Sequence, residues 1–202
     1  MTVVDLGQHA RGTTGACFWL CLAAGLSRIG WNAPAASDAF SDSEPALVHR
    51  VAAMSFEDLN VGCRSRALDK SPVGELAARL RQHFCVGPQA ILLQPRVVQT
   101  VFPAFALIAA RADRGGINDY KRWVGRLGCT EYADELIIHT AAREHGIKLR
   151  IVPYTPRTAA GTWNISEYPH PDADDHPPDA NGGQFITMGN NDVHFVWLAP
   201  SE

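Results

Sequence analysis

The sequence lacks the features that mark several large classes of protein. It has no cluster of lysine and arginine, and its net charge of −3 argues against a nucleic-acid-binding surface. Its longest apolar run, Phe102–Ala110, contains a proline and is far too short to cross a bilayer. The chain starts without a basic segment followed by an apolar stretch, so no signal peptide is predicted. We therefore expect a soluble, cytoplasmic protein that binds neither nucleic acid nor membrane.

Paired cysteines and metal-ligand spacings are also missing. The five cysteines are an odd number, lie far apart and form no CxxC pair, so neither a disulfide framework nor a zinc finger is expected. His170 and His176 lie close to Asp172 and Asp174, but their spacing matches no standard ligand set. The sequence therefore predicts no metal and no cofactor.

What the chain does contain is enough apolar sequence for one core. Hydrophobic residues make up 46% of its 202 residues, which suits a single domain over 1–202 and, in our expectation, a monomer. Apolar periodicity predicts helices first and strands late, the order of an α+β domain with a small β-sheet packed between helices. The predicted helices span 16–30, 45–54, 72–85, 118–126 and 132–145, and the predicted strands span 149–154, 185–188 and 194–198. The segment 88–110 fits a helix or a strand.

One segment differs in composition from the rest of the chain. Residues 155–183 form a Pro/Asp-rich segment with five prolines and four aspartates. A segment of this composition buries little apolar surface. This composition predicts a surface loop inserted between two core strands.

Two residues at opposite ends of the chain form a candidate catalytic pair. Cys17 follows a small-residue loop and opens an apolar helical run, where backbone N–H groups and the helix dipole stabilise a thiolate. His194 is predicted to lie in the last apolar strand, which would hold it rigidly as a base. If the two meet in the fold, the protein is a cysteine hydrolase. The alternative is that Cys17 is a small apolar core residue and His194 a core histidine.

Small residues precede the candidate nucleophile. The backbone amides of Thr14, Gly15 and Ala16 are candidates for an oxyanion hole, in which each donor is worth about 2–4 kcal/mol. An ordinary glycine turn before a helix explains the same residues, and both interpretations can hold together.

Three blocks of sequence resemble the ovarian-tumour (OTU) family of cysteine proteases. Gly15–Trp19 is similar to the family's Asp-Gly-Asn-Cys-Leu/Phe-Phe/Trp opening, and His194-Phe195 to its terminal His-Tyr or His-Trp. Between them, Asp119–Val152 looks like the family's Tyr-x-x-x-Met, Glu-Leu-x-Ala helix and following strand. The resemblance implies a papain-like domain that hydrolyses the peptide or isopeptide bond after the C-terminal Gly-Gly of ubiquitin or a ubiquitin-like protein.

The sequence departs from the family's pattern at several site positions. Thr14 and Ala16 stand where the family has Asp and Asn, and Val196 stands where many members have an acid or amide that orients the histidine. The third catalytic member is therefore open. Asp5 is one candidate, because some members use an acid upstream of the cysteine, and Asn190–Asp192, above all Asn191 or Asp192, are the others.

Aromatic residues adjoin both members of the pair. In an enzyme that reads a Gly-Gly tail, Phe18 and Trp19 beside the cysteine and Phe195 and Trp197 beside the histidine are candidates to wall a narrow substrate channel. Core packing explains them equally well.

Two further functions fit the same sequence. One is an OTU-like protease that processes a polyprotein, and the other is a catalytically inactive module that binds ubiquitin. The missing acid after His194 favours the inactive module. A bacterial effector or viral protease of this type would act in the cytosol of a host cell.

Overall fold

The computed structural model describes residues 2–6, 15–31, 44–59, 71–110, 115–129, 132–153, 165–169, 185–190 and 194–200. Within these ranges the chain forms a mixed α+β fold with one five-stranded sheet, which confirms the predicted class. The helices are α1 (Ala16–Arg28), α2 (Glu44–Ala52), α4 (Pro72–Cys85), the 3₁₀ helix η2 (Ile91–Leu93), α5 (Pro95–Ala109), α6 (Ile117–Leu127) and α7 (Glu135–His145). The strands are β1 (Thr2–Val4), β2 (Lys148–Pro153), β3 (Ser166–Tyr168), β4 (Phe185–Asn190) and β5 (Phe195–Ala199).

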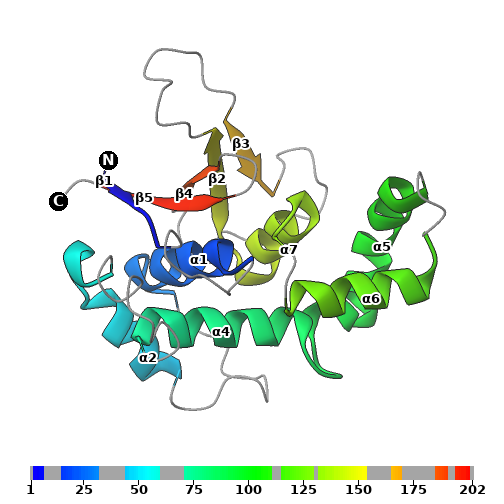
Figure 1. Ribbon diagram of the computed structural model, residues 1–202, viewed down its shortest axis with the longest axis horizontal. Helices are drawn as coiled ribbons and strands as arrows, with labels where there is room; N and C mark the ends of the chain where they lie inside the picture. Colours follow the sequence, from blue (N-terminus) through cyan, green and yellow to red (C-terminus); the bar gives the residue numbers. More distant parts are fainter. Residues whose placement is uncertain are drawn as a thin grey trace.

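The sheet joins the two ends of the sequence. Its strand order is β1-β5-β4-β2-β3, so the first strand lies beside the last (Figure 1). β1 pairs antiparallel with β5, with Val4 opposite Trp197, and β4 pairs antiparallel with β5 on its other side. β2 and β4 are parallel, and β3 is an antiparallel edge strand. Every residue of β5 is buried, as expected of an apolar strand covered on both faces.

Helix α1 forms the centre of the core. Its residues from Cys17 to Ser27 are all buried, because the helix is apolar on every side. Figure 1 shows α1 between the sheet and α4, and it packs against β4, β5, α2 and α4. Gly25 allows the closest approach to the sheet, since a Cβ there would lie 2.4 Å from Cγ2 of Ile186 on β4.

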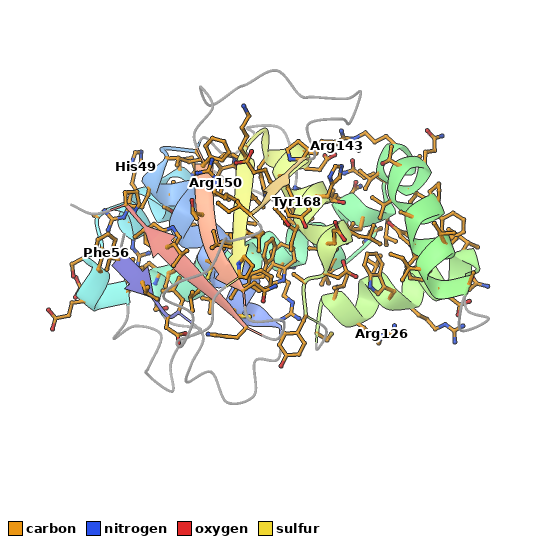
Figure 2. All side chains as sticks on the ribbon, turned by 90° about the horizontal axis from the view of Figure 1, so that it is seen from above. His49, Phe56, Arg126, Arg143, Arg150 and Tyr168 are labelled. Carbon is orange, nitrogen blue, oxygen red and sulfur yellow. The ribbon has the colours of Figure 1, made fainter. Side chains whose placement is uncertain are left out.

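Helices α5 and α6 lie away from β1, at the other end of the molecule (Figure 1). Figure 2 shows this arrangement from above, with His49 of α2 toward the left and Arg126 of α6 right of centre. A group of aromatic rings stabilises this end of the molecule, where Phe105 and Trp123 pack against Tyr120. The Tyr120 hydroxyl donates a hydrogen bond to the Leu92 carbonyl at 2.7 Å. None of the helices in the described ranges is long and apolar enough to span a membrane.

Two differences between the predicted and the observed elements concern a helix start and the predicted loop. The helix predicted over 132–145 begins at Glu135, because the Asp134 side chain accepts a hydrogen bond from the Ile137 amide at 3.1 Å and caps the helix there. The continuous loop predicted over 155–183 is interrupted by β3, in which Tyr168 pairs with Leu149 of β2. Within 155–183, only residues 165–169 belong to the described part of the chain.

The ambiguous segment 88–110 is helical, with η2 followed by α5. Pro95 occupies the first turn of α5, where a missing N–H costs nothing.

The close approach of α1 to β4 predicts a specific cost for a larger residue. Gly25→Ala should lower the free energy of unfolding by about 1–3 kcal/mol, because Ile186 is nearly fully buried and has no room to move aside. Denaturant unfolding would measure the difference. Gly125→Ala on the exposed face of α6 is the matched control: a Cβ there meets nothing within 4 Å, so it should be neutral or stabilise by up to about 1 kcal/mol. A Gly25→Ala protein as stable as the original would contradict the packing described.

Candidate active site

Cys17 lies in the first turn of α1. Its side chain faces the core and the residue is 7% exposed. The first backbone N–H groups of a helix have no carbonyl partner within it, so they carry the partial positive charge that favours an anion such as a thiolate. Gly15, immediately before the helix, has φ +77°, a left-handed conformation that glycine adopts without strain.

Asp5 and His194 meet through the pairing of β1 with β5. Asp5 follows the last residue of β1, and His194 precedes the first residue of β5. Because the two strands are antiparallel, these positions lie at the same end of the pair. Nε2 of His194 is 2.8 Å from Oδ1 of Asp5, and both side chains are about a quarter exposed.

The Cys17 side chain is the second hydrogen-bonding group that acts on the His194 imidazole. The hydrogen bond to Asp5, followed by that to Cys17, raises the pKa of His194 to about 10, against the opposing effect of burial. The imidazole is therefore cationic at neutral pH and lies between a thiol and a carboxylate. A thiol, a cationic imidazole and a carboxylate in this order can stabilise a thiolate and donate a proton to a leaving group.

The structure thus brings together three of the residues singled out in the sequence, Cys17, His194 and Asp5. His194 lies just before β5 rather than inside the strand. Gly15 and Ala16 adjoin Cys17 at the start of α1, while Thr14 of the predicted oxyanion hole lies outside the described residues. Of the alternative third members, Asn191 and Asp192 also lie outside them, and Asn190 ends β4 opposite Phe195.

The structure places the four aromatic residues that are candidates to wall a substrate channel in the core. Phe18, Trp19, Phe195 and Trp197 are at most 3% exposed. Phe18 packs edge-to-face on Phe195, with ring centroids 5.5 Å apart, and Trp197 packs on Phe56 at 5.7 Å. They are core residues because α1 and β5 are buried on all sides. By joining α1 to β5, the Phe18–Phe195 contact fixes the helix that carries Cys17 against the strand that follows His194.

Arg81 of α4 is a charged neighbour of the site that the sequence analysis did not single out. Its Nε donates to the Leu127 carbonyl at 2.6 Å, at the end of α6. Its guanidinium interacts electrostatically with Cys17, Cys85 and Cys129. Sequence spacing gives no signal for this residue, because the neighbours come from α1, α4 and the end of α6.

No protein-family model matches the chain, and no curated protein matches it in sequence. Among the described residues, no group of three or more histidine, cysteine or acidic side chains is placed to hold a metal ion.

The charge of His194 should depend on Asp5. Asp5→Ala should lower the pKa of His194 from about 10 toward the ordinary value of 6.5, because it removes the largest stabilising hydrogen bond. Asp5→Asn, which keeps an acceptor without the charge, should lower it less. NMR titration of the imidazole would measure both, and a His194 signal unchanged by Asp5→Ala would contradict the assigned contact.

The same shift predicts how stability depends on pH. Because the folded state holds the His194 proton more tightly than the unfolded state, the contribution of the pair is fully present below pH 6.5 and is lost as pH rises through about 10. Unfolding measured across this range should show that loss in the original protein and a weaker loss in Asp5→Ala.

Proposed function

We propose that this protein is an OTU-like, papain-like cysteine protease that hydrolyses the peptide or isopeptide bond after the C-terminal Gly-Gly of ubiquitin or a ubiquitin-like protein. The observation that carries the proposal is the sequence of contacts Asp5–His194–Cys17. A nucleophile hydrogen-bonded to a base that is itself oriented by a third group is the general signature of covalent hydrolytic catalysis. The three sequence blocks that resemble the OTU family supply the substrate class.

The fold supports this proposal by the way it supplies the groups. The nucleophile comes from the N-terminal turn of the central helix, and the base and acid come from the ends of two paired strands beside it. All three are thus held by packed elements rather than by long loops, which favours a preorganised site.

Acylation would begin from a Cys17 thiolate paired with protonated His194. The sulfur attacks the carbonyl carbon after the Gly-Gly tail, and the carbonyl oxygen becomes an oxyanion. As the carbon–nitrogen bond breaks, His194 gives its proton to the leaving lysine amine. The products of this half-reaction are the free amine and a thioester on Cys17.

Deacylation would use the neutral His194 that acylation leaves behind. It takes a proton from a water molecule, whose oxygen attacks the thioester carbonyl. Collapse of the tetrahedral intermediate breaks the carbon–sulfur bond and releases the carboxylate of the substrate tail. Cys17 returns to the thiolate and His194 to its protonated form, held by Asp5.

Oxyanion stabilisation would come from the start of α1. The backbone N–H groups of Ala16 and Cys17 lie in the first helical turn, where no helical carbonyl accepts from them. The left-handed Gly15 sets the direction from which the chain enters this turn. Such donors act without any side chain, so Ala16 can take the place of the family's asparagine in this role.

The contact with Asp5 favours an enzyme over an inactive ubiquitin-binding module. The absence of an acid two residues after His194, where Val196 stands, is the sequence feature that favours the inactive module. Asp5 offers a carboxylate to the same imidazole from the other end of the chain. A module that only binds ubiquitin has no need for this arrangement.

A ubiquitin carrying an electrophilic warhead at its C-terminus tests the proposal. The original protein should form a covalent adduct, visible by intact mass, and Cys17→Ala should form none. Cys21→Ala is the matched control, because Cys21 lies one turn further along α1 with its side chain fully buried. His194→Ala should slow the reaction by about 10²–10⁴-fold, the usual contribution of a general acid–base group.

Two results separate the alternatives. If ubiquitin gives no adduct but another ubiquitin-like probe does, the proposed hydrolase activity is supported and its substrate is that ubiquitin-like protein. If no modifier reacts and Cys17 in the folded protein is no more reactive to a small alkylating agent than in His194→Ala, the proposal of an enzyme is overturned.

A further inference from the structure

A buried histidine lies outside the candidate active site, at the end of α7. His145 is 7% exposed and packs on two aromatic rings, perpendicular to Trp31 with centroids 4.9 Å apart and tilted over Phe84 at 5.3 Å. Its Nε2 atom is buried and has no hydrogen-bond partner in the part of the chain that the structure describes. Buried polar atoms are normally hydrogen-bonded, and the proposed hydrolysis makes no use of this side chain, so the unpaired nitrogen needs another explanation.

The two aromatic rings connect the imidazole to α1, the helix that carries Cys17. Trp31 lies just beyond α1, and its amide donates to a carbonyl in the last turn of that helix at 3.0 Å. Phe84 of α4 packs on Trp19, two residues after Cys17, with ring centroids 5.5 Å apart. Figure 1 shows α7 beside α1 and α4. A change at the imidazole would therefore act on α1 near both of its ends.

These surroundings suit a neutral imidazole and oppose a charged one. An unpaired charge costs far more to bury than an unpaired polar atom. Burial lowers the pKa of His145 from 6.5 to about 3, and the charge of the nearby His83 on α4 lowers it as well. A proton on the ring is thus stabilised when the ring leaves the aromatic contacts and reaches water.

The charged groups on the elements around the imidazole do not offset its charge. Helix α7 packs against α5, β2 and β3, and Glu144 of α7 pairs with Arg96 of α5 and with the adjoining Arg143. His83 is the group whose charge changes the pKa of His145, and it disfavours the proton. The other charged side chains on these elements, and on α1 and α4, make contacts elsewhere: Glu167 with Arg150, Glu135 with Tyr168, Glu75 with Arg79, Lys148 with Phe185, Arg81 with the Leu127 carbonyl and Arg28 with the Met54 carbonyl.

The carboxyl end of α7 is also closed by the backbone. Helix termini attract cations through their unpaired carbonyls. Here the amide of Gly146 donates to the Arg143 carbonyl at 3.2 Å, and the amide of Ile147 donates to the Ala142 carbonyl at 3.0 Å. The left-handed Gly146, with φ +60°, makes this ending possible. The carbonyls that would otherwise attract a cation thus already have backbone partners.

We propose that His145 is an acid-sensitive switch: a proton on its ring separates the end of α7 from Trp31 and Phe84, and this loosens the helix that carries Cys17. The neutral ring completes the packing between α7, α4 and the end of α1. The charged ring has no acceptor there and moves toward water, so the aromatic contacts on either side of it are lost together.

The direction of the pH effect follows from the two states of the ring. In the opened state His145 takes up the proton with the ordinary pKa of 6.5, so opening becomes more favourable as pH falls below 6.5, and this effect is complete at about pH 3. The Asp5–His194 pair behaves in the opposite way, since its contribution is fully present below pH 6.5. Acid therefore acts on the candidate site through the packing of α1.

The first test compares the full chain with His145→Phe, which keeps an aromatic ring and removes the titrating nitrogen. Urea unfolding measured at about pH 7.5 and at about pH 5.5 gives the ratio of folded to unfolded protein under each condition. A single group with a pKa of 6.5 when unfolded and about 3 when folded lowers this ratio by about tenfold between the two conditions. The fall in the original protein should therefore exceed the fall in His145→Phe by about tenfold.

Three further variants support this comparison. His49→Gln is the matched control, because His49 is exposed on α2 and its loss should leave the pH dependence unchanged. His83→Gln should weaken the pH dependence by less than His145→Phe, because it removes a second histidine whose pKa is lowered by burial. If His145→Phe does not fold, His145→Gln removes the same titration. The readout is the change between two pH values within one protein, so a different starting stability does not affect it.

The second test asks whether the switch reaches α1. Hydrogen exchange measured at about pH 5.5 should be faster for the amides of residues 18–28 in the original protein than in His145→Phe, with a smaller difference at about pH 7.5. Comparing the two proteins at one pH removes the effect of pH on the exchange chemistry itself.

Two results would overturn the proposal. One is an equal loss of stability in acid in the original protein and in the His145 variants, and the other is equal exchange of the α1 amides in the original protein and in His145→Phe at about pH 5.5. Neither readout depends on hydrolytic activity, so the switch and the proposed function succeed or fail separately.

Discussion

The antiparallel pairing of β1 with β5 is the interaction on which the candidate site depends. It places the residue after β1 and the residue before β5 at one end of the sheet, where Asp5 and His194 are 2.8 Å apart. Backbone hydrogen bonds between the two strands, and the burial of Val4 and Trp197, supply the free energy that fixes them.

The third group of the site is fixed by the core rather than by polar contacts. Helix α1 is held against the sheet by Phe18 on Phe195 and by the close approach of Gly25 to Ile186. A shift of α1 along the sheet would therefore disturb this packing as it moved Cys17 away from His194. Phe18, which adjoins Cys17 in sequence, thus has a structural role in the candidate site.

The elements predicted most accurately are those whose sequence signals, such as caps and first-turn prolines, are local. The bounds of α4 agree at both ends, because Ser71 caps the helix and Pro72 occupies its first turn. By contrast, β3 is a three-residue edge strand whose only support is its pairing with β2, which composition does not reveal. The choice of Asp5 among several candidate partners for His194 required the sheet order, since the two lie 189 positions apart.

The direction of side chains is the other feature that could not be predicted from the sequence. Phe18 and Trp19 adjoin Cys17 in sequence but are buried, since proximity in sequence does not tell which side of a helix faces a ligand.

The position of β5 in the sheet also sets when the site can form during synthesis. A ribosome produces β1 and the Cys17 helix well before β5, the strand that follows His194. Until β5 has emerged and inserted between β1 and β4, His194 cannot reach Asp5. The candidate site therefore assembles only after β5 has joined the sheet, and β1 must stay available for that pairing until then.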